Sequence, residues 1–247
     1  ITNVRYDHVF EMGDSLEEIA ASLSSTIPEN GTLCTADPLA ASLFEDACQK
    51  KNCRLALCPA TGTSSENIGV ARAVSALLGV TEEEFQKSLP TVKEDFGIRK
   101  RYSMENGRHE VFHFVNLFSA NDPQSTKNNV EDERNGCAEL CFLYNHREDR
   151  PDRALLFARH FFPHYRDCAV YLTGAGAALP KRLFAMAGVA DLRVVRDYRD
   201  CLKQIPSGAL LVGIGNIKGA GYRMIKELEE EHPEITGSVA KGGLRDE

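Results

Sequence analysis

The chain has 247 residues, of which 43% are hydrophobic and 26% are charged, and its formal net charge is −7. This balance is ordinary for a globular protein, and the negative charge disfavours a nucleic-acid partner. No run approaches the roughly 18 uninterrupted apolar residues that a membrane-spanning helix needs. The eight cysteines include no C-x-x-C pair and several lie in apolar runs. The sequence therefore predicts reduced thiols, not a disulfide framework or a zinc site.

The first hundred residues alternate between helical and strand-like patterns. Capping boxes formed by Ser15 with Glu18 and by Thr81 with Glu84 each predict the start of a helix. Apolar periodicity predicts two further helices, one over 38–50 and one that begins at Ser64 or Ser65 and runs to Leu78. Short apolar runs at 32–35 and 54–58 predict strands. Residues 91–110 are polar and glycine-containing, which predicts a domain boundary near 108–112.

The second half of the chain is more regular. Strands are predicted at 111–118, 138–144, 168–173, 192–196 and 209–214, and helices at 122–134, 151–162, 180–188, 198–204 and 219–231. This alternation is typical of an α/β domain whose parallel sheet is covered on both faces. Ligands bind such sheets beyond the carboxyl ends of the strands. Candidate site residues are therefore sought directly after the strands.

Polar residues follow the first of these strands. Asp122 precedes Pro123, which is the pattern of a well-capped helix. More polar side chains gather here than a cap needs, and a binding site at the helix amino end is an equally good interpretation. The candidate ligands are Asn116, Asn121, Asp122, Ser125 and Thr126.

Acidic and basic residues alternate after the second strand, from Arg147 through Asp149 and Arg150 to Arg153. Guanidinium groups bind carboxylates and phosphates in bidentate fashion, so this segment can form a preorganised clamp for an oxyanion. The alternative is a surface salt-bridge cluster that contributes little stability. The position at the end of a strand favours the clamp.

After the last strand come Gly213, Gly215, Asn216, Lys218 and Gly219. Their spacing does not meet the G-x-G-x-x-G dinucleotide fingerprint. We interpret the segment as backbone N–H groups available at a helix amino terminus.

The chain begins with a second polar group, made of Asn3, Asp7 and His8. It can deliver polar ligands from a strand edge into a site. A histidine beside an aspartate is also often a hydrogen-bonded structural pair.

Taken in order, these blocks resemble the Mur ligase superfamily of ATP-dependent amide ligases, and within it the poly-γ-glutamate synthase branch. The resemblance rests on Asn3-x-x-x-Asp7-His8, on Ser65-Glu66-Asn67 with its alanine-rich helix, and on the turn Gly107-Arg108-His109-Glu110. It also rests on the segments 118–126, 147–153 and 213–220. It implies part of a central ATPase domain over residues 1–108 and a Rossmann-like carboxyl-terminal domain over residues 109–247.

The resemblance also implies a chemistry. ATP and Mg²⁺ would convert a chain-end carboxylate to an acyl phosphate, which the amine of an incoming glutamate attacks. The resemblance places His8 on the metal and Asn3 and Asn67 beside the nucleotide. It makes Arg147, Asp149 and Arg150 catalytic. The implied substrate-binding residues are Asn121, Asp122, Ser125, Arg153 and Asn216.

No G-x-x-x-x-G-K-[ST] phosphate loop occurs in these residues. We expect that loop before Ile1, together with a segment that attaches the protein to the cytoplasmic side of the membrane beside other synthase subunits. The expected partners are glutamate and the poly-γ-glutamate chain, and the 247 residues alone are expected to be inactive. Two alternatives remain open. One is another ligase of the superfamily, either folylpolyglutamate-like or an amino-acid ligase. The other is a non-catalytic assembly or binding subunit.

Overall fold

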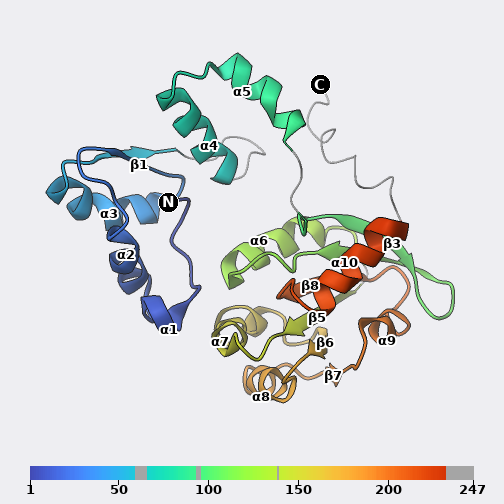
Figure 1. Ribbon diagram of the computed structural model, residues 1–247. Coiled ribbons are helices and arrows are strands. Elements are labelled where there is room, and N and C mark those ends of the chain that lie inside the picture. Colours follow the sequence, from blue (N-terminus) through green and yellow to red (C-terminus); the bar gives the residue numbers. More distant parts are fainter. Residues whose placement is uncertain (59–65, 93–95, 138, 232–247) are drawn as a thin grey trace. The chain divides into compact units, whose positions relative to one another are not determined.

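The computed structural model describes residues 1–58, 66–92, 96–137 and 139–231 (Figure 1). These residues form two compact units. The first holds the described residues up to 92 and the second those from 96 to 231. The chain therefore divides near residue 93, before the predicted boundary at 108–109. The described part of the chain contains no helix that is both long and apolar enough to cross a membrane.

The first unit is built on two parallel strands, β1 (Thr32–Thr35) and β2 (Arg54–Leu57). Both predicted capping boxes are present, at the starts of α2 and α5. The predicted start of α4 at Ser64 or Ser65 lies outside the described residues. The helices are α1 (Val9–Met12), α2 (Leu16–Ser24), α3 (Pro38–Lys50), α4 (Glu66–Leu77) and α5 (Glu82–Ser88), followed by a 3₁₀ turn at Leu89–Thr91.

The second unit holds a six-stranded sheet in the order β3-β4-β8-β5-β6-β7. All neighbouring strands run parallel except β3, which pairs antiparallel with β4. The strands are β3 (Arg101–Glu105), β4 (Val111–Asn116), β5 (Leu140–His146), β6 (Ala169–Gly174), β7 (Leu192–Val194) and β8 (Leu210–Gly215). The predicted α/β class with a parallel-dominated sheet is thus confirmed, and β3 is an addition.

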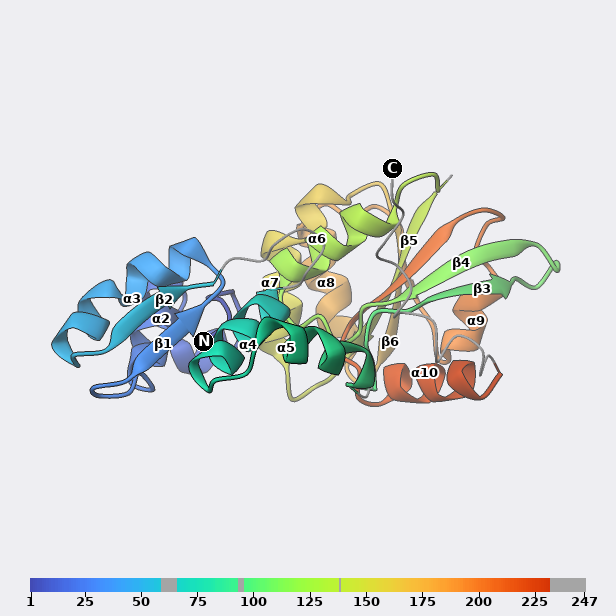
Figure 2. The same cartoon turned by 90° about the horizontal axis from the view of Figure 1, so that it is seen from above.

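Five helices cover the sheet, so that the central strands are buried on both faces. They are α6 (Pro123–Glu133), α7 (Pro151–His160), α8 (Ala178–Met186), α9 (Tyr198–Leu202) and α10 (Ala220–Glu231). Helices α6, α7 and α8 lie on one face of the sheet and α9 and α10 on the other (Figure 2). Side chains of the first three pack into one core cluster, and those of the other two into a second. Along β5, Phe142 and Tyr144 enter the first cluster, while Cys141 and Leu143 enter the second. This alternation explains the uninterrupted apolar run in the sequence.

Candidate functional site

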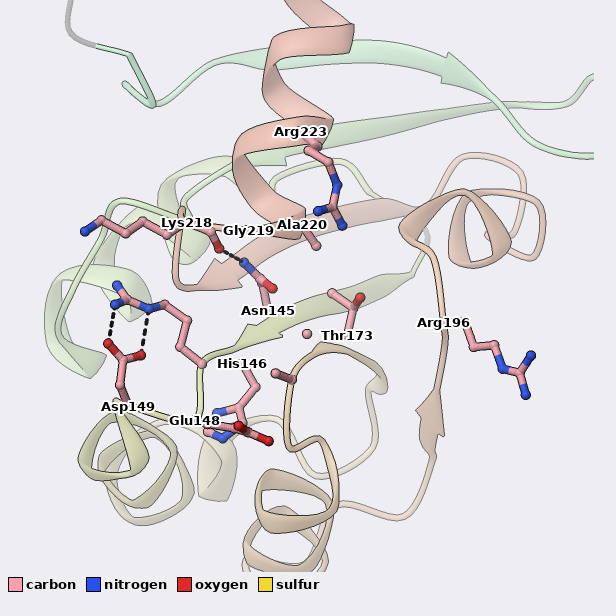
Figure 3. A pocket seen from close by; sticks show the side chains of 13 residues that line it. Asn145, His146, Glu148, Asp149, Thr173, Arg196, Lys218, Gly219, Ala220 and Arg223 are labelled. Carbon is pink, nitrogen blue, oxygen red and sulfur yellow. Dashed lines mark hydrogen bonds and ion pairs between the residues drawn. The ribbon is translucent and has the colours of Figure 1, made fainter.

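A cavity of about 580 Å³ lies at the carboxyl edge of the second unit's sheet. Its walls come from the segments that follow β5, β6 and β8, from Arg196 beyond β7, and from the start of α10 (Figure 3). Strands β5 and β8 are neighbours, yet the helices that follow them, α7 and α10, pack on opposite faces of the sheet. Such a reversal opens a crevice between the two loops. The cavity occupies that crevice.

Asn145 joins the end of β5 to the loop before α10. Its side-chain nitrogen donates to the carbonyl oxygen of Asn216 at 2.6 Å, and to that of Lys218 at 2.7 Å (Figure 3). Its side-chain oxygen is buried and has no donor among the described residues. A buried acceptor left in this state costs about 1–3 kcal/mol. Asn145 thus marks this pair of loops as a candidate binding site.

Two glycines allow this close approach. Gly215 has a φ of +97°, and a Cβ there would lie 2.7 Å from the Asn145 carbonyl oxygen. A Cβ on Gly221 would lie 2.9 Å from the Asn216 carbonyl oxygen. The first turn of α10 consequently borders the cavity, with Gly219 and Ala220 in its wall. The N–H groups of a first helical turn carry partial positive charge, which favours an anionic ligand.

Arg147 and Asp149, two of the predicted catalytic residues, line the cavity and form a bidentate ion pair. The hydrogen bond from Arg147 holds the pKa of Asp149 below its ordinary value. Arg150, the third predicted catalytic residue, lies outside the cavity wall and pairs with Asp152 at 3.2 Å. The predicted clamp therefore consists of two adjacent ion pairs, of which one faces the cavity.

Arg153 and Asn216, predicted to bind substrate, are buried and bonded to each other. The Arg153 guanidinium donates to Asn216 Oδ1 at 2.9 Å and to the Gly215 carbonyl oxygen at 3.1 Å. Their exposed fractions are 4% and 2%, and neither side chain lines the cavity. This geometry ties the start of α7 to the end of β8, so it can position the loops on either side of the cavity.

Of the residues predicted after β4, Asn116 ends the strand and is buried, and the others lie at the start of α6, outside the cavity wall. Asp122 caps the helix by accepting from the Ser125 backbone N–H at 2.8 Å. Thr126 is buried and donates to the Asp122 carbonyl oxygen at 2.8 Å. Asn121 is exposed. The helix-cap interpretation thus describes Asp122 and Ser125, and the cap leaves Asn121 available to a ligand at the same edge of the sheet.

The first unit brings Asn3 close to the start of α4. Asn3 donates to Glu66 at 2.5 Å, and Glu66 precedes Asn67, which is exposed. Arg5 supports the arrangement by pairing with Glu66 at 2.9 Å and with Asp37 at 2.6 Å. Two predicted nucleotide-binding residues, distant in sequence, therefore lie near one another.

His8 occupies a left-handed conformation, with a φ of +53°, at the start of α1. Its ring is half-exposed, and its two nitrogens lie 3.8 Å from Asp7 and 3.9 Å from Glu11. Within the described residues, no group of three or more His, Cys, Asp or Glu is arranged to hold a metal ion.

Sequence reasoning missed several cavity residues. Thr173 lies at the end of β6, Arg196 follows β7, and Arg223 lies in the first turn of α10. Lys218 also lines the cavity, and the sequence placed it in the segment 213–220 without a role of its own. Thr173 and Arg196 fell within the predicted strands 168–173 and 192–196, at their carboxyl ends. The rule that ligands bind beyond the carboxyl ends of strands would have found both, had it been applied to every strand.

The fold is that of the folylpolyglutamate synthases. The structure of Escherichia coli FolC in complex with ADP matches 94% of this chain, and this chain covers 61% of FolC, with a TM-score of 0.63 and 11% sequence identity. The folylpolyglutamate synthase of Thermotoga maritima matches 95% of the chain and is covered to 61%, with a TM-score of 0.52 and 18% identity. At these identities the match defines the fold alone.

The sequence defines the family. Residues 101–231 match the model of the poly-γ-glutamate synthase CapB C-terminal domain, and the chain belongs to this family. The capsule biosynthesis protein CapB of Bacillus anthracis is 28% identical over 94% of the chain, and PGA synthase CapB of Bacillus subtilis (strain 168) is 27% identical over 93%. The chain spans 54% and 64% of the lengths of these two relatives. The family predicted from the sequence is thus confirmed.

Proposed function

We propose that this chain is part of an ATP-dependent amide ligase that extends a γ-linked glutamate polymer. The observation that carries the proposal is that the family match over 101–231 contains every residue of the cavity wall. The relatives are named as capsule biosynthesis protein and PGA synthase. A cavity walled by arginine, lysine and a helix amino terminus suits a substrate that carries carboxylates.

In this proposal the cavity receives glutamate. Arg147, fixed by Asp149, and Lys218 hold its carboxylates, and Asn145 keeps the two loops together. Arg153 and Asn216 act as positioning residues because both are buried beneath the site. The second substrate, the end of the polymer, binds at the same edge of the sheet. There it meets Arg150 and the turn that contains Asn121, Asp122 and Ser125.

The proposed reaction has two transfers. A carboxylate oxygen of the polymer attacks the γ-phosphorus of ATP, the bond to the bridging oxygen breaks, and ADP leaves. The amine nitrogen of glutamate then attacks the acyl carbon, phosphate leaves with the electron pair of the broken C–O bond, and the nitrogen loses a proton. Holding the amine against the acyl phosphate is the main task of the protein in the second step.

ATP and a divalent metal, Mg²⁺, belong to the proposal. One solved relative by fold is a complex with ADP, and another is a folylpolyglutamate synthase with AMPPNP and Mn. Asn3 and Asn67 are the candidates beside the nucleotide, and His8 is the candidate metal ligand. No step of the proposed reaction runs through the metal. Membrane subunits of a synthase are the proposed partners, at the cytoplasmic side of the membrane.

The test is polymer synthesis by the complete gene product with Arg147→Ala and, separately, Arg150→Ala. Loss of one charge-assisted hydrogen bond to a carboxylate corresponds to about a tenfold decrease in rate or more. The matched control is Arg159→Ala, an exposed arginine on α7 that does not line the cavity.

Unchanged synthesis in both variants would contradict a catalytic role and favour an assembly subunit. Extension of a pterin-linked glutamate in preference to the free polymer would instead favour a folylpolyglutamate-like ligase. A loss confined to Arg147→Ala would keep the cavity and remove Arg150 from the catalytic residues.

A further inference from the structure

Basic side chains follow three of the four strands that end at the cavity, and a fourth lies on α10. Arg147 follows β5, Arg196 follows β7, Lys218 follows β8, and Arg223 lies in the first turn of α10. Among the described residues Arg147 alone of the four has an acidic partner. Arg193 and Arg199, the nearest arginines to Arg196 in the chain, each pair with an aspartate. Within the described residues, Arg196, Lys218 and Arg223 are thus left available to an anionic ligand.

These four residues form a row along the sheet edge, which we call the carboxylate track. The strand order places β8, β5, β6 and β7 side by side. With neighbouring strands about 4.8 Å apart, the ends of β8 and β7 are three spacings, roughly 15 Å, from each other. Lys218 and Arg196 accordingly lie on opposite sides of the cavity, with Arg223 between them and directed toward it (Figure 3).

A single glutamate is too short for this row. Five backbone bonds separate equivalent atoms of a γ-linked chain, against three in an α-linked one, so one extended γ-linked unit spans about 6 Å. Two or three successive units would match the roughly 15 Å between the ends of β8 and β7. Each unit carries one free α-carboxylate, so a bound segment would present several anions along this edge of the sheet.

We propose that the carboxylate track binds a segment of the γ-linked polymer, with α-carboxylates on Arg223 and Arg196 in the wall of the same cavity. This inference rests on the proposed function, and it assigns to the same edge of the sheet a polymer site in addition to the site for one glutamate. The track also explains how a negatively charged chain can bind a polyanion. The chain carries a net charge of −7, so a polyanion approaches it favourably only where basic residues are locally unpaired.

The experiment is calorimetric binding to the 247-residue chain of free glutamate, a short γ-linked glutamate oligomer and an α-linked oligomer of equal charge. We expect the γ-linked oligomer to bind more tightly than either of the others. Its affinity should also fall more steeply with added salt than that of glutamate, because several exposed charge pairs are screened together. Equal binding of the α-linked oligomer would overturn the assignment to a γ-linked chain.

Variants locate the site. Arg196→Gln and Arg223→Gln should each weaken oligomer binding about two- to fivefold, the usual range for one exposed ion pair, and weaken it more than they weaken glutamate binding. Arg182→Gln, on the exposed side of α8 and outside the cavity wall, is the matched control. Oligomer affinity that Arg196→Gln and Arg223→Gln reduce no more than Arg182→Gln would overturn the track.

The outcomes separate this inference from the proposed function. Glutamate binding without additional affinity for the oligomer would overturn the track and keep the glutamate cavity. Oligomer binding that depends on Arg196, without any glutamate binding, would support the track and contradict the glutamate cavity. Absence of binding by both ligands would contradict both.

Discussion

His146, the last residue of β5, is a buried base whose charge the fold opposes. Its exposed fraction is 2%, its ring stacks on Tyr144 with the centroids 6.3 Å apart, and its Nδ1 has no partner among the described residues. Burial lowers the pKa of His146, and the nearby Glu148 and Asp149 only partly oppose this effect. The neutral imidazole is therefore the form that the folded state accommodates.

This arrangement predicts a loss of stability on acidification. Because the folded-state pKa lies below the unfolded value of about 6.5, the unfolded chain takes up the proton first as the pH falls, so the stability is complete above that pH and declines below it. His146→Gln should therefore make the decline between about pH 7.5 and pH 5.5 shallower. Denaturant unfolding followed by tyrosine circular dichroism suits the test, since every tyrosine except Tyr6 lies in the second unit.

The exposed His164 provides the comparison. His164→Gln should leave the pH dependence of the unfolding midpoint as it is in the unsubstituted chain. An equal slope in all three proteins would show that His146 does not contribute to the pH dependence. The burial of His160 also lowers its pKa, so some decline should persist in His146→Gln.

At the scale of elements, the sequence predicted most of what local rules control. Both capping boxes form, and the parallel strands and helices of the second unit lie within a few residues of their predicted positions. The sequence analysis did not predict strand β3. Most of its residues are polar and exposed, with Tyr102 buried between them, so the segment was interpreted as part of a polar linker. Its antiparallel pairing with β4 is a hairpin joined by residues 106–110. The Asn106-Gly107 pair in that loop is a local hairpin signal, and the prediction did not use it.

For the candidate site, too, the sequence predicted the local features and not the contacts between loops. The loops after β4, β5 and β8 were predicted because their polar residues follow strands. The roles of the arginines depend on how these loops fold together. Arg153 is buried against Gly215 and Asn216. Arg150 pairs with Asp152. Spacing along the chain cannot distinguish an arginine that faces a ligand from one that supports the backbone.

The segment that enters the second unit is an element with its own effect on the site. Gly97 has a φ of +96° and is buried, and a Cβ there would overlap Ile217 and Ser119. Ile217 is the residue before Lys218, which lines the cavity. Ser119 lies in the loop before α6. Beside Gly97, the ring of Phe96 packs on Tyr222 of α10, with centroids 4.5 Å apart. The entering backbone therefore supports both candidate substrate loops.

Gly97→Ala should weaken the second unit and its ligand binding together. Alanine adds about 1–2 kcal/mol of backbone strain at a positive φ, and overpacking adds typically 1–3 kcal/mol more. Gly136→Ala isolates the strain, since Gly136 has a φ of +79° and its Cβ would meet nothing within 4 Å. The unfolding midpoint should fall further in Gly97→Ala, and glutamate affinity should decrease only there. Equal effects of the two substitutions would exclude a supporting role for Gly97.

At the scale of the whole molecule, the chain forms two units whose hydrophobic cores differ in size. Both large core clusters belong to the second unit, whereas the first is built on a two-stranded sheet. A smaller core leaves less apolar surface buried to offset the entropy of folding. We therefore expect the first unit to unfold at a lower denaturant concentration than the second.

The cysteines provide a direct measurement of this order. All eight are free, with four in the first unit (34, 48, 53 and 58) and four in the second (137, 141, 168 and 201). A thiol reacts as the exposed thiolate, and burial raises the pKa of Cys141 to about 12 and that of Cys168 to about 11. Alkylation in rising denaturant, read by peptide mass spectrometry, should therefore label the first unit's four thiols in one step and the second unit's in a later step. Labelling of all eight in one transition would mean that the two units unfold as one, and that the smaller core derives its stability from the larger.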